Sequence, residues 1–313
     1  MDKELTLICG DALEELKKIP SKSVKLVVTD PPYNLNKDYG NNQDDLEFND
    51  YLEFSRAWIK EASRILTDNG AIFVFMGMRY ISYIYEILEK EFGFYFNSWI
   101  TWFYTQGIGK TKGFSPRHDD ILYFTKHPKK FTFNLDSIRV PQKFYRSVNN
   151  MRGANPGNVW KFSHMHYCNK NRTKHPTQKP EGVFERIILS ASNEGDTVLD
   201  PFVGSGTCLR VCQQTNRKGI GIDINPEYIA MSQARLEEAF MGFDSIDERM
   251  KRVPNDLNDA QIRIEYIENH INWFLNNHPD AIAEYLDEVR AKYYDKMEQS
   301  GQLWFFDKYT VSV

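Results

Sequence analysis

The sequence predicts an α/β protein built on one open sheet, and three observations support this fold class. Short apolar runs with strand character alternate with segments of helical periodicity. Two of these runs end in an acid at the start of a turn, Asp30 and Asp223. A turn of small residues at 203–207 joins another run to a helix, and its glycines allow a ligand to approach the backbone closely. The turns after the strands are therefore the expected location of the chemistry.

The individual elements follow from apolar spacing and turn signals. Residues 5–8 alternate as a strand, and the helix at 12–19 stops before Pro20. The apolar run 24–28 is a buried strand that two prolines must end. A polar stretch at 34–50 is expected to be a mobile loop over the site. The remaining expected strands are 71–76, 98–104, 121–125, 197–200 and 219–223, and the remaining expected helices are 51–66, 80–90, 183–191 and 209–213.

The composition indicates one large domain with additions. At 313 residues and 41% hydrophobic content, the chain can bury one substantial core. The charged N-terminus does not have the layout of a secretion signal, and no apolar run approaches the length that spans a membrane. A cytoplasmic protein without a membrane partner is expected.

The cysteines and histidines do not indicate a metal site. Four cysteines have neither disulfide-framework nor zinc-ribbon spacing, so reduced thiols are expected. A zinc cluster of His164, His166, Cys168 and His175 is an alternative, but the first three alternate too tightly for the usual ligand pairs. No metal is expected.

Positive charge is concentrated in one segment, although the whole chain carries a formal charge of −4. Residues 126–180 contain twelve Lys or Arg against a single acid, Asp136. Such a run can be an ordinary solvated face, but here it is interleaved with aromatic residues, which favours a surface that follows phosphates and contacts bases. The candidate DNA-binding residues are Lys143, Arg146, Arg152, Lys161, Lys170, Arg172 and Lys174.

The segment from Asp30 to Tyr33 is the strongest candidate for catalysis. Pro31 and Pro32 cannot donate backbone hydrogen bonds and stiffen the turn, which leaves carbonyl acceptors beside the Asp30 carboxylate. The Tyr33 ring can lie flat on a planar ligand. This combination suits an amino group attached to an aromatic base. The alternative is a strand-ending turn with a surface tyrosine.

A second motif indicates an adenosine-type cofactor. Asp200 lies at a strand tip before the 203–207 turn, and Asp223 ends the next strand about twenty residues later, as ribose recognition requires. A phosphate-binding loop needs Lys followed by Ser or Thr after its glycines, and a dinucleotide site needs a third glycine. Neither is present, which argues against a pyrophosphate ligand.

These motifs resemble those of the β-class amino-methyltransferases of DNA, which modify N6 of adenine or N4 of cytosine. Residues 30–33 resemble the catalytic motif and residues 200–207 the S-adenosylmethionine motif, and their order is typical of the β class. The resemblance extends from about residue 5 to 236 and is closest to type II restriction-modification companion methylases and their orphan relatives. It implies a seven-stranded Rossmann-like methyltransferase sheet with circularly permuted motif order.

The resemblance also implies a domain organisation. The catalytic half of the methyltransferase domain is expected at 1–125, the target-recognition insertion at 126–174 and the S-adenosylmethionine-binding half at 175–240. A helical C-terminal extension is expected at 241–313, where an apolar helix face favours packing or dimerisation.

Residue roles follow from the same resemblance. The expected catalytic residues are Asp30, Pro31, Pro32 and Tyr33. The expected cofactor-binding residues are Asp11, Asp30, His175, Thr177, Lys179, Asp200, Phe202, Gly204, Ser205, Gly206, Thr207 and Asp223.

The expected activity is methyl transfer from S-adenosylmethionine to N6 of a flipped-out adenine at a specific site in double-stranded DNA. Asp30, where cytosine-modifying members have serine, favours adenine. N4-cytosine methylation, methylation of RNA or of a protein amide, and a catalytically silent DNA-binding module are the alternatives. A homodimer and a separately acting restriction endonuclease are possible partners.

Overall fold

The computed structural model describes residues 4–35, 44–105, 109–140, 153–165 and 172–238. The chain divides into two compact units, one of Met1–Ile138 with Pro156–Met250 and one of Arg139–Asn155 with Lys251–Val313. In the described part of the second unit, Val140 and Ala154 form an antiparallel bridge. The expected C-terminal extension lies outside the described residues. The first unit carries all the elements discussed below.

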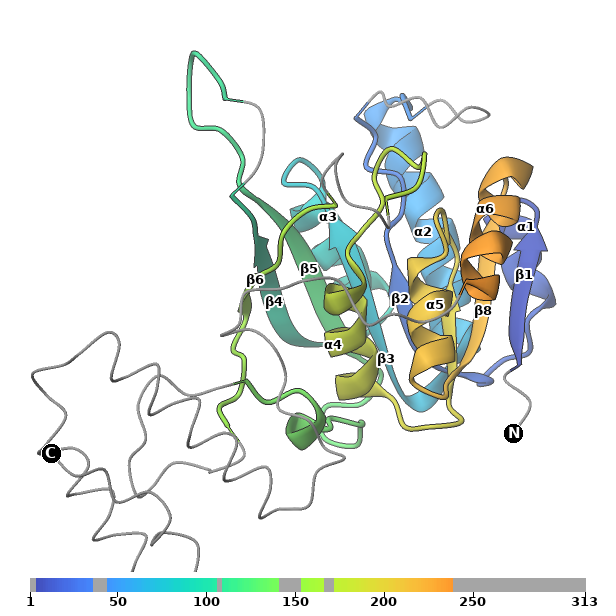
Figure 1. Ribbon diagram of the computed structural model, residues 1–313. Helices are drawn as coiled ribbons and strands as arrows, with labels where there is room; N and C mark the ends of the chain where they lie inside the picture. The colour runs from blue at the N-terminus through green and yellow to red at the C-terminus, as the bar shows by residue number, and fades with distance from the viewer. Residues whose placement is uncertain (1–3, 36–43, 106–108, 141–152, 166–171, 239–313) are drawn as a thin grey trace, which may run out of the picture. The chain divides into compact units, whose positions relative to one another are not determined.

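The described residues of the first unit form an eight-stranded sheet (Figure 1). Its order is β1 (Leu5–Cys9), β8 (Lys218–Asp223), β7 (Thr197–Asp200), β2 (Val24–Thr29), β3 (Leu66–Met76), β5 (His118–Thr125), β4 (Tyr95–Phe103) and β6 (Val159–Lys161). Of these strands, β5 alone is antiparallel to its neighbours, and every other pair is parallel. The predicted α/β class is confirmed.

The expected number of seven strands is wrong by one, because β6 adds an edge strand inside the basic segment. Its three residues pair in parallel with residues 101–103 of β4. Only Trp160 of the three is buried, so the segment lacks the repeated alternation that identifies a strand in a sequence. Pairing with β4 therefore decides its conformation.

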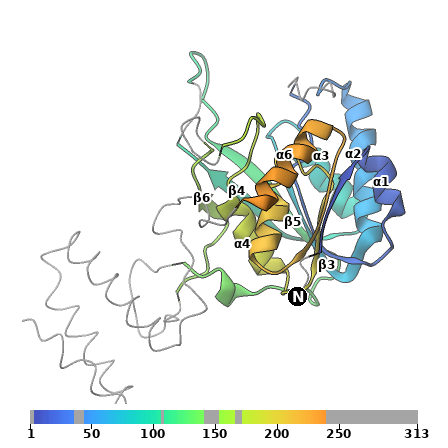
Figure 2. The ribbon, with the colours of Figure 1, turned by 45° about the vertical axis from the view of Figure 1, so that its right-hand side comes forward.

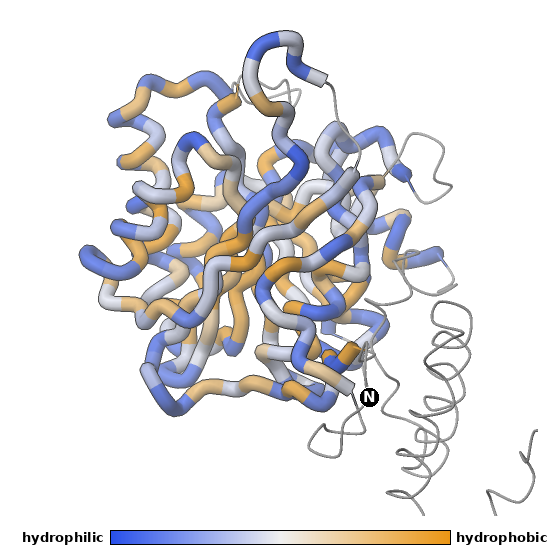
Figure 3. Tube along the Cα trace, turned by 90° about the vertical axis from the view of Figure 1, so that its left-hand side faces the viewer, coloured by the Kyte–Doolittle hydropathy of each residue, from blue (hydrophilic) through white to orange (hydrophobic). Residues whose placement is uncertain are grey.

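Helices cover both faces of the sheet (Figures 1 and 2). One hydrophobic cluster joins one face to α1 (Ala12–Lys18), α2 (Phe48–Ile65) and α3 (Ile81–Glu86). A second cluster joins the other face to α4 (Glu181–Ala191) and α5 (Thr207–Gln214), with α6 (Pro226–Glu237) packed beside them. Alternate residues of β2 enter the two clusters, so all six of its residues are buried. Figure 3 shows hydrophobic segments along the middle of this unit.

Two expected helices differ from the prediction. The helix expected at 51–66 is α2, which begins at Phe48 and ends at Ile65, and Leu66 is already extended and begins β3. Residues 66–70 therefore form the first part of a long strand, ahead of the strand expected at 71–76. The helix expected at 80–90 comprises α3 and a π-helical turn, Ile87–Glu91. A short 3-10 helix, Leu135–Ser137, follows β5, and no helix within the described residues is long and apolar enough to span a bilayer.

The strand order brings four acids to one edge of the sheet. β1, β8, β7 and β2 are consecutive and parallel, so their carboxyl ends meet at the same edge. Asp11, Asp223, Asp200 and Asp30 lie at or directly after these ends. In open α/β sheets this edge is where ligands bind.

Candidate active site

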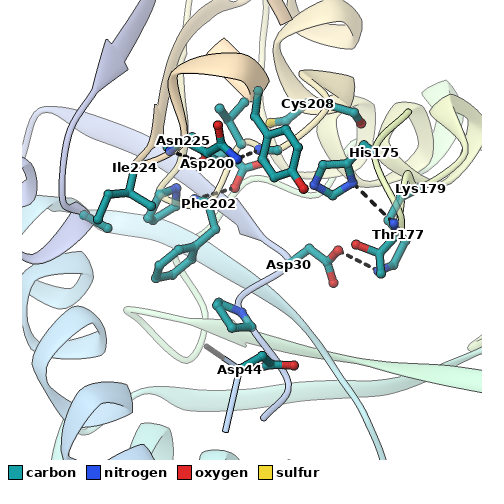
Figure 4. Close-up of a pocket in the computed structure, with 18 of the residues that line it drawn as sticks. Asp30, Asp44, His175, Thr177, Lys179, Asp200, Phe202, Cys208, Ile224 and Asn225 are labelled. Carbon is teal, nitrogen blue, oxygen red and sulfur yellow. Dashed lines mark hydrogen bonds and ion pairs between the residues drawn. The ribbon is translucent and has the colours of Figure 1, made fainter. Parts of the chain in front are cut away.

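A cavity of about 290 Å³ opens at this edge of the sheet (Figure 4). All four strand-end acids line it. Its walls also include aromatic side chains from α2 and from the turn after β7, Phe54 and Phe202, whose ring centroids are 5.8 Å apart. An apolar wall combined with a few converging carboxylates is typical of a small-molecule site.

The Asp30 carboxylate is held from two sides. Lys179 Nζ lies 2.6 Å from Oδ2, and the Tyr33 hydroxyl donates to Oδ1 over 2.7 Å. The Lys179 ammonium also lies over the Tyr33 ring, 5.2 Å from its centroid. Asp30 and Lys179 are 149 positions apart in the sequence, so the fold joins the predicted catalytic motif to a predicted cofactor-binding residue at this ion pair (Figure 4).

Asn34 fixes the chain directly after this turn. It is buried with a φ of +55°, a conformation that asparagine tolerates better than most residues. Its side chain bonds Leu46 in both directions, accepting from the backbone N–H over 2.6 Å and donating to the carbonyl over 2.7 Å. Asp44 accepts from the Asn34 backbone N–H over 2.6 Å. The loop predicted at 34–50 ends earlier, because α2 begins at Phe48, and these bonds join its first residue to Asp44 and Leu46. Residues 36–43 lie outside the described residues.

The glycine turn between β7 and α5 is bonded to the next strand. Asp223 accepts from the Gly204 backbone N–H over 3.0 Å and from the Asn225 backbone N–H over 2.9 Å. Gly204 has a φ of +49°, and a Cβ there would lie 2.8 Å from His175 Nε2. Glycine at this position therefore lets the turn pass directly under the histidine.

A buried ion network supports the same turn from behind. Glu181 Oε1 accepts from Arg235 over 2.8 Å and pairs with Arg210 Nε over 2.9 Å, and all three side chains are buried. Arg235 also donates to the Ser205 carbonyl over 2.6 Å, while Ser232 donates to the Gly204 carbonyl over 2.9 Å. Charged side chains from α4, α5 and α6 thus position the turn. No local pattern in the sequence indicates this network, because its members are far apart along the chain.

Burial changes the protonation of several groups in the site. It raises the pKa of Asp200 well above the usual range, with Asp30 and Asp223 adding to the effect. It also raises the pKa of Asp223. The pKa of His175 is lowered to about 4 by burial, so its ring is neutral at pH 7. His175 Nδ1 accepts the Thr177 backbone N–H over 3.3 Å, which assigns the ring proton to Nε2.

The fold brings the predicted catalytic and cofactor residues together. All of them line the cavity except Pro31, Tyr33 and Gly206, which directly adjoin residues that do. Further lining residues that the sequence did not indicate include Tyr51, Phe54, Asn225 and Tyr228. Asn225 could have been found, because an Asn followed by Pro directly after a strand is a helix-start signal, and Asn225 does cap α6. The aromatic residues carry no comparable signal.

A match over residues 24–234 decides the family: this segment fits the family described as DNA methylase, of the N6 and N4 types. The chain belongs to this DNA methylase family. Residues 184–311 also match the D12 class of N6 adenine-specific DNA methyltransferases. The family predicted from residues 30–33 and 200–207 is thereby confirmed.

Individual relatives agree with this assignment. The type II methyltransferase M.HpaI of Haemophilus parainfluenzae is 69% identical over 293 residues, which cover 94% of this chain and 93% of that protein. The DNA adenine methyltransferase YhdJ of Escherichia coli is 38% identical over 247 residues, which cover 75% of this chain and 83% of that protein. The predicted enzyme class, a methyltransferase, is confirmed.

Solved structures of similar proteins share the fold. The M1.HpyAVI complex with S-adenosylmethionine has 28% identity and a TM-score of 0.53, covering 74% of this chain and 100% of that one. The cytosine-N4-specific PvuII DNA methyltransferase has a TM-score of 0.61 and 20% identity, covering 85% of this chain and 93% of that one, which shows a shared fold alone. S-adenosylmethionine, the predicted cofactor, is the ligand of that M1.HpyAVI structure.

Three of the residues predicted to bind DNA lie within the described part of the methylase. Lys161 is exposed at the end of β6, opposite Phe103 at the end of β4 and so on the same edge as the cavity. Lys174 is exposed and directly precedes His175 of the cavity wall, and Arg172 donates to the Met165 carbonyl. The predicted residues outside the described part are Lys143, Arg146, Arg152 and Lys170.

The residues weighed as a zinc cluster do not come together within the described part of the methylase. His164 packs edge-on against Tyr104, with ring centroids 3.9 Å apart, whereas His175 lines the cavity. His166 and Cys168 lie outside the described residues. The described residues contain no group of three potential metal ligands.

Proposed function

We propose that this methylase transfers the methyl group of S-adenosylmethionine to N6 of an adenine in double-stranded DNA, at a specific sequence. The observation that carries the proposal is the Asp30 carboxylate, held by Lys179 and Tyr33 on the wall of a cavity that the 203–207 turn also lines. The match of residues 184–311 to an adenine-specific class supports adenine as the base.

The cavity has the groups that S-adenosylmethionine requires. Asp223, at the end of β8, would bind the ribose hydroxyls, and the backbone of the 203–207 turn can approach the ligand closely because of its glycines. The buried Asp200 carboxylate, whose raised pKa reflects the lack of solvent, would be stabilised by the positive methionine end. When bound, the cofactor supplies a methyl group that its sulfonium has already activated.

Asp30 makes the adenine amine reactive by accepting hydrogen bonds from its N–H groups. The lone pair of that nitrogen is delocalised into the ring, so it is a poor nucleophile until hydrogen bonds localise it. Each oxygen of Asp30 already accepts one hydrogen bond, and a carboxylate oxygen has a second lone pair for another. With the Pro31 carbonyl as second acceptor, both N–H groups are oriented and the lone pair faces the methyl group.

Transfer is then a direct displacement. With the cofactor bound, the nitrogen–carbon bond would form while the sulfur–carbon bond breaks, and the resulting ammonium would lose one proton afterwards. No residue needs to act as a strong base or covalent nucleophile, because the leaving group is a neutral thioether. The role of the protein is to position the base, to exclude water and to stabilise the positive charge that moves onto the amine.

Access to the nitrogen requires the adenine to leave the duplex. The Tyr33 ring adjoins Asp30 and would stack on the flipped base, while Lys161, Arg172 and Lys174 would contact the phosphates. The same proposal includes a restriction-modification setting in the cytoplasm, with a homodimer and a separately acting endonuclease as possible partners. The relatives named as type II methyltransferases support the restriction-modification setting.

Incubation with tritium-labelled S-adenosylmethionine and unmodified bacterial genomic DNA tests the proposal. Chromatography of the nucleosides, with sequencing of modified positions, should find the label in N6-methyladenosine at one recurring sequence. Label in N4-methylcytosine would show that the target base is cytosine and not adenine. Transfer to RNA alone would show that the substrate is RNA and not DNA. Asp30→Ala, which retains the glycine turn, should transfer no label.

A further inference from the structure

A basic loop on the active-site edge carries a fully exposed phenylalanine. Residues 109–117 lead from β4 into β5 and project beyond the ends of these strands (Figure 1). Phe114 is 100% exposed, the highest value among the large hydrophobic side chains of the described residues. Ser115 Oγ accepts from the Lys110 backbone N–H over 2.7 Å, and Gly113 has a φ of +87°. The backbone around Phe114 therefore has a defined turn.

The charge of this loop suits a polyanion. Lys110 and Lys112 are exposed, Arg117 follows, and the loop contains no acid between residues 109 and 117. The two acids that come next are engaged in the strands: Asp120 accepts from Trp99 Nε1 over 2.9 Å, and Asp119 accepts from the Tyr104 hydroxyl. A single exposed apolar side chain needs no explanation by itself, but one placed among the cations of an acid-free loop at a DNA-modifying edge does.

The loop lies close enough to Asp30 for one DNA duplex to contact both. β4 is parallel to β2 and separated from it by β3 and β5, so their carboxyl ends share one edge. Three strand spacings amount to about 14 Å, or roughly four base steps along a strand of DNA. One duplex can thus contact this loop while one of its bases occupies the site at Asp30.

We propose that Phe114 is a wedge that enters the DNA stack a few base steps from the target adenine, while Lys110, Lys112 and Arg117 bind the flanking phosphates. Apolar side chains inserted between base steps unstack them and kink the duplex, and this distortion lowers the cost of extruding a base from the same segment. The inference rests on the proposed function and adds an element outside the segment 126–174. The partner is double-stranded DNA that contains the target site.

Phe114→Ala tests the wedge on a duplex that contains the recurring sequence found in genomic DNA. The substrate is used in two forms, fully paired and with a mismatch opposite the target adenine, because a mismatched base is already partly free to flip. We expect kcat/KM of the variant to fall roughly tenfold or more on the paired duplex and less than about threefold on the mismatched one. The kcat/KM of Phe114→Leu, which keeps an apolar side chain, should fall less on the paired duplex.

Tyr95→Ala is the matched control, because Tyr95 is an exposed aromatic residue at the opposite end of β4. It should methylate both duplexes at the wild-type rate. All variants should bind S-adenosylmethionine like the wild type, which verifies their folding. Equal losses on the paired and mismatched duplexes, or no loss, would overturn the wedge. Failure of the wild type to methylate any DNA would instead overturn the proposed function, and the wedge with it.

The cations are tested separately by salt dependence. Replacing Lys110 and Lys112 with alanine should make the slope of log K against log salt shallower by about 1.8, since each lost phosphate contact contributes about 0.9. The control is the pair Lys17 and Lys18, which are exposed in the last turn of α1, outside the basic segment. Alanine at these two positions should leave the slope unchanged. The same slope in the Lys110/Lys112 variant would exclude phosphate binding by this loop.

Discussion

The glycine turn at 203–207 and the basic loop at 109–117 lie on the same edge of one sheet but are held in different ways. The first is buried and bonded to Asp223, Ser232 and Arg235. The second is exposed and has an internal bond between Lys110 and Ser115. A turn that binds a small cofactor must have its donors in place beforehand, whereas a loop that follows DNA can adjust to the duplex.

The two regions use glycine differently as well. Gly206 and Gly113 have similar φ angles, +76° and +87°. A Cβ on Gly206 would lie 2.7 Å from Ser232 Oγ, whereas a Cβ on Gly113 would meet no atom within 4 Å. Glycine at 206 therefore satisfies both a backbone and a packing requirement, and glycine at 113 a backbone requirement alone. Local sequence does not distinguish the two cases.

The largest effect on the rate of methyl transfer is expected at Asp30, on the wall of the cavity that the buried glycine turn also lines. Asp30→Asn should lower the single-turnover rate by roughly 10³-fold, because a neutral amide stabilises the developing ammonium poorly. Titration calorimetry should show little change in affinity for S-adenosylmethionine. Tyr33→Phe removes the hydroxyl bond to Asp30 but keeps the ring, and should cost about tenfold. Wild-type turnover in Asp30→Asn would remove this carboxylate from the mechanism.

Glu181→Ala should cause the largest loss of stability. It leaves Arg210 and Arg235 buried without the carboxylate they share, and breaking such a network costs about 3–5 kcal/mol in the free energy of unfolding. Urea denaturation measures the loss. Glu14→Ala, which breaks the exposed pair with Lys17, should have no measurable effect. Equal effects of the two changes would contradict a structural role of the network.

The neutral His175 predicts a specific pH dependence. Its pKa is about 4 in the folded protein and near 6.5 in an unfolded chain, so between these values the unfolded state binds a proton that the folded state does not. This contribution to stability is present above pH 6.5 and is lost as pH falls through 4, by about 3 kcal/mol.

His175→Asn isolates this effect, because an amide oxygen can replace Nδ1 as acceptor for the Thr177 N–H. The stability of the wild type relative to this variant should decline between pH 6.5 and 4. The raised pKa values of Asp200 and Asp223 act in the opposite direction, but they are present in both proteins. A difference in unfolding free energy that is independent of pH would mean that His175 titrates normally.

Alanine at the two glycines sharpens the comparison of the loops directly. Gly113→Ala should cost about 1 kcal/mol for the left-handed backbone alone. Gly206→Ala adds a steric clash with Ser232, so it should cost about 1–3 kcal/mol more. Denaturant midpoints of the two variants measure the difference. Equal midpoints would show that the turn can move away from α6.

The smallest effect is expected from the described cations of the predicted recognition segment. Alanine at both Lys161 and Lys174 should make the salt dependence of DNA binding shallower by up to about 1.8, one phosphate contact for each lysine. Methyl transfer at saturating DNA should be unchanged. Filter-binding measurements of DNA affinity between low and moderate salt concentration give this slope. An unaltered slope would place the phosphate contacts on other residues.

The sequence indicated most of the fold and of the cofactor motif, because these depend on local patterns. Apolar runs with intervening helical spacing identified seven of the eight described strands, and β6 was missed because three residues are too few for a periodic signal. The boundary at Leu66 was missed because a helical spacing of apolar residues continued into a strand. Element identity was thus easier to predict than element ends.

What the sequence determined by itself is the chemistry of each segment: prolines 31 and 32 end a strand beside Asp30, and the glycines at 204 and 206 permit the turn after β7. The tertiary structure decided which segments meet. It pairs Asp30 with Lys179, joins Glu181 to Arg210 and Arg235, and separates Lys110 from Lys129 by the length of β5. Strand order depends on contacts between distant residues, so no local pattern can contain it.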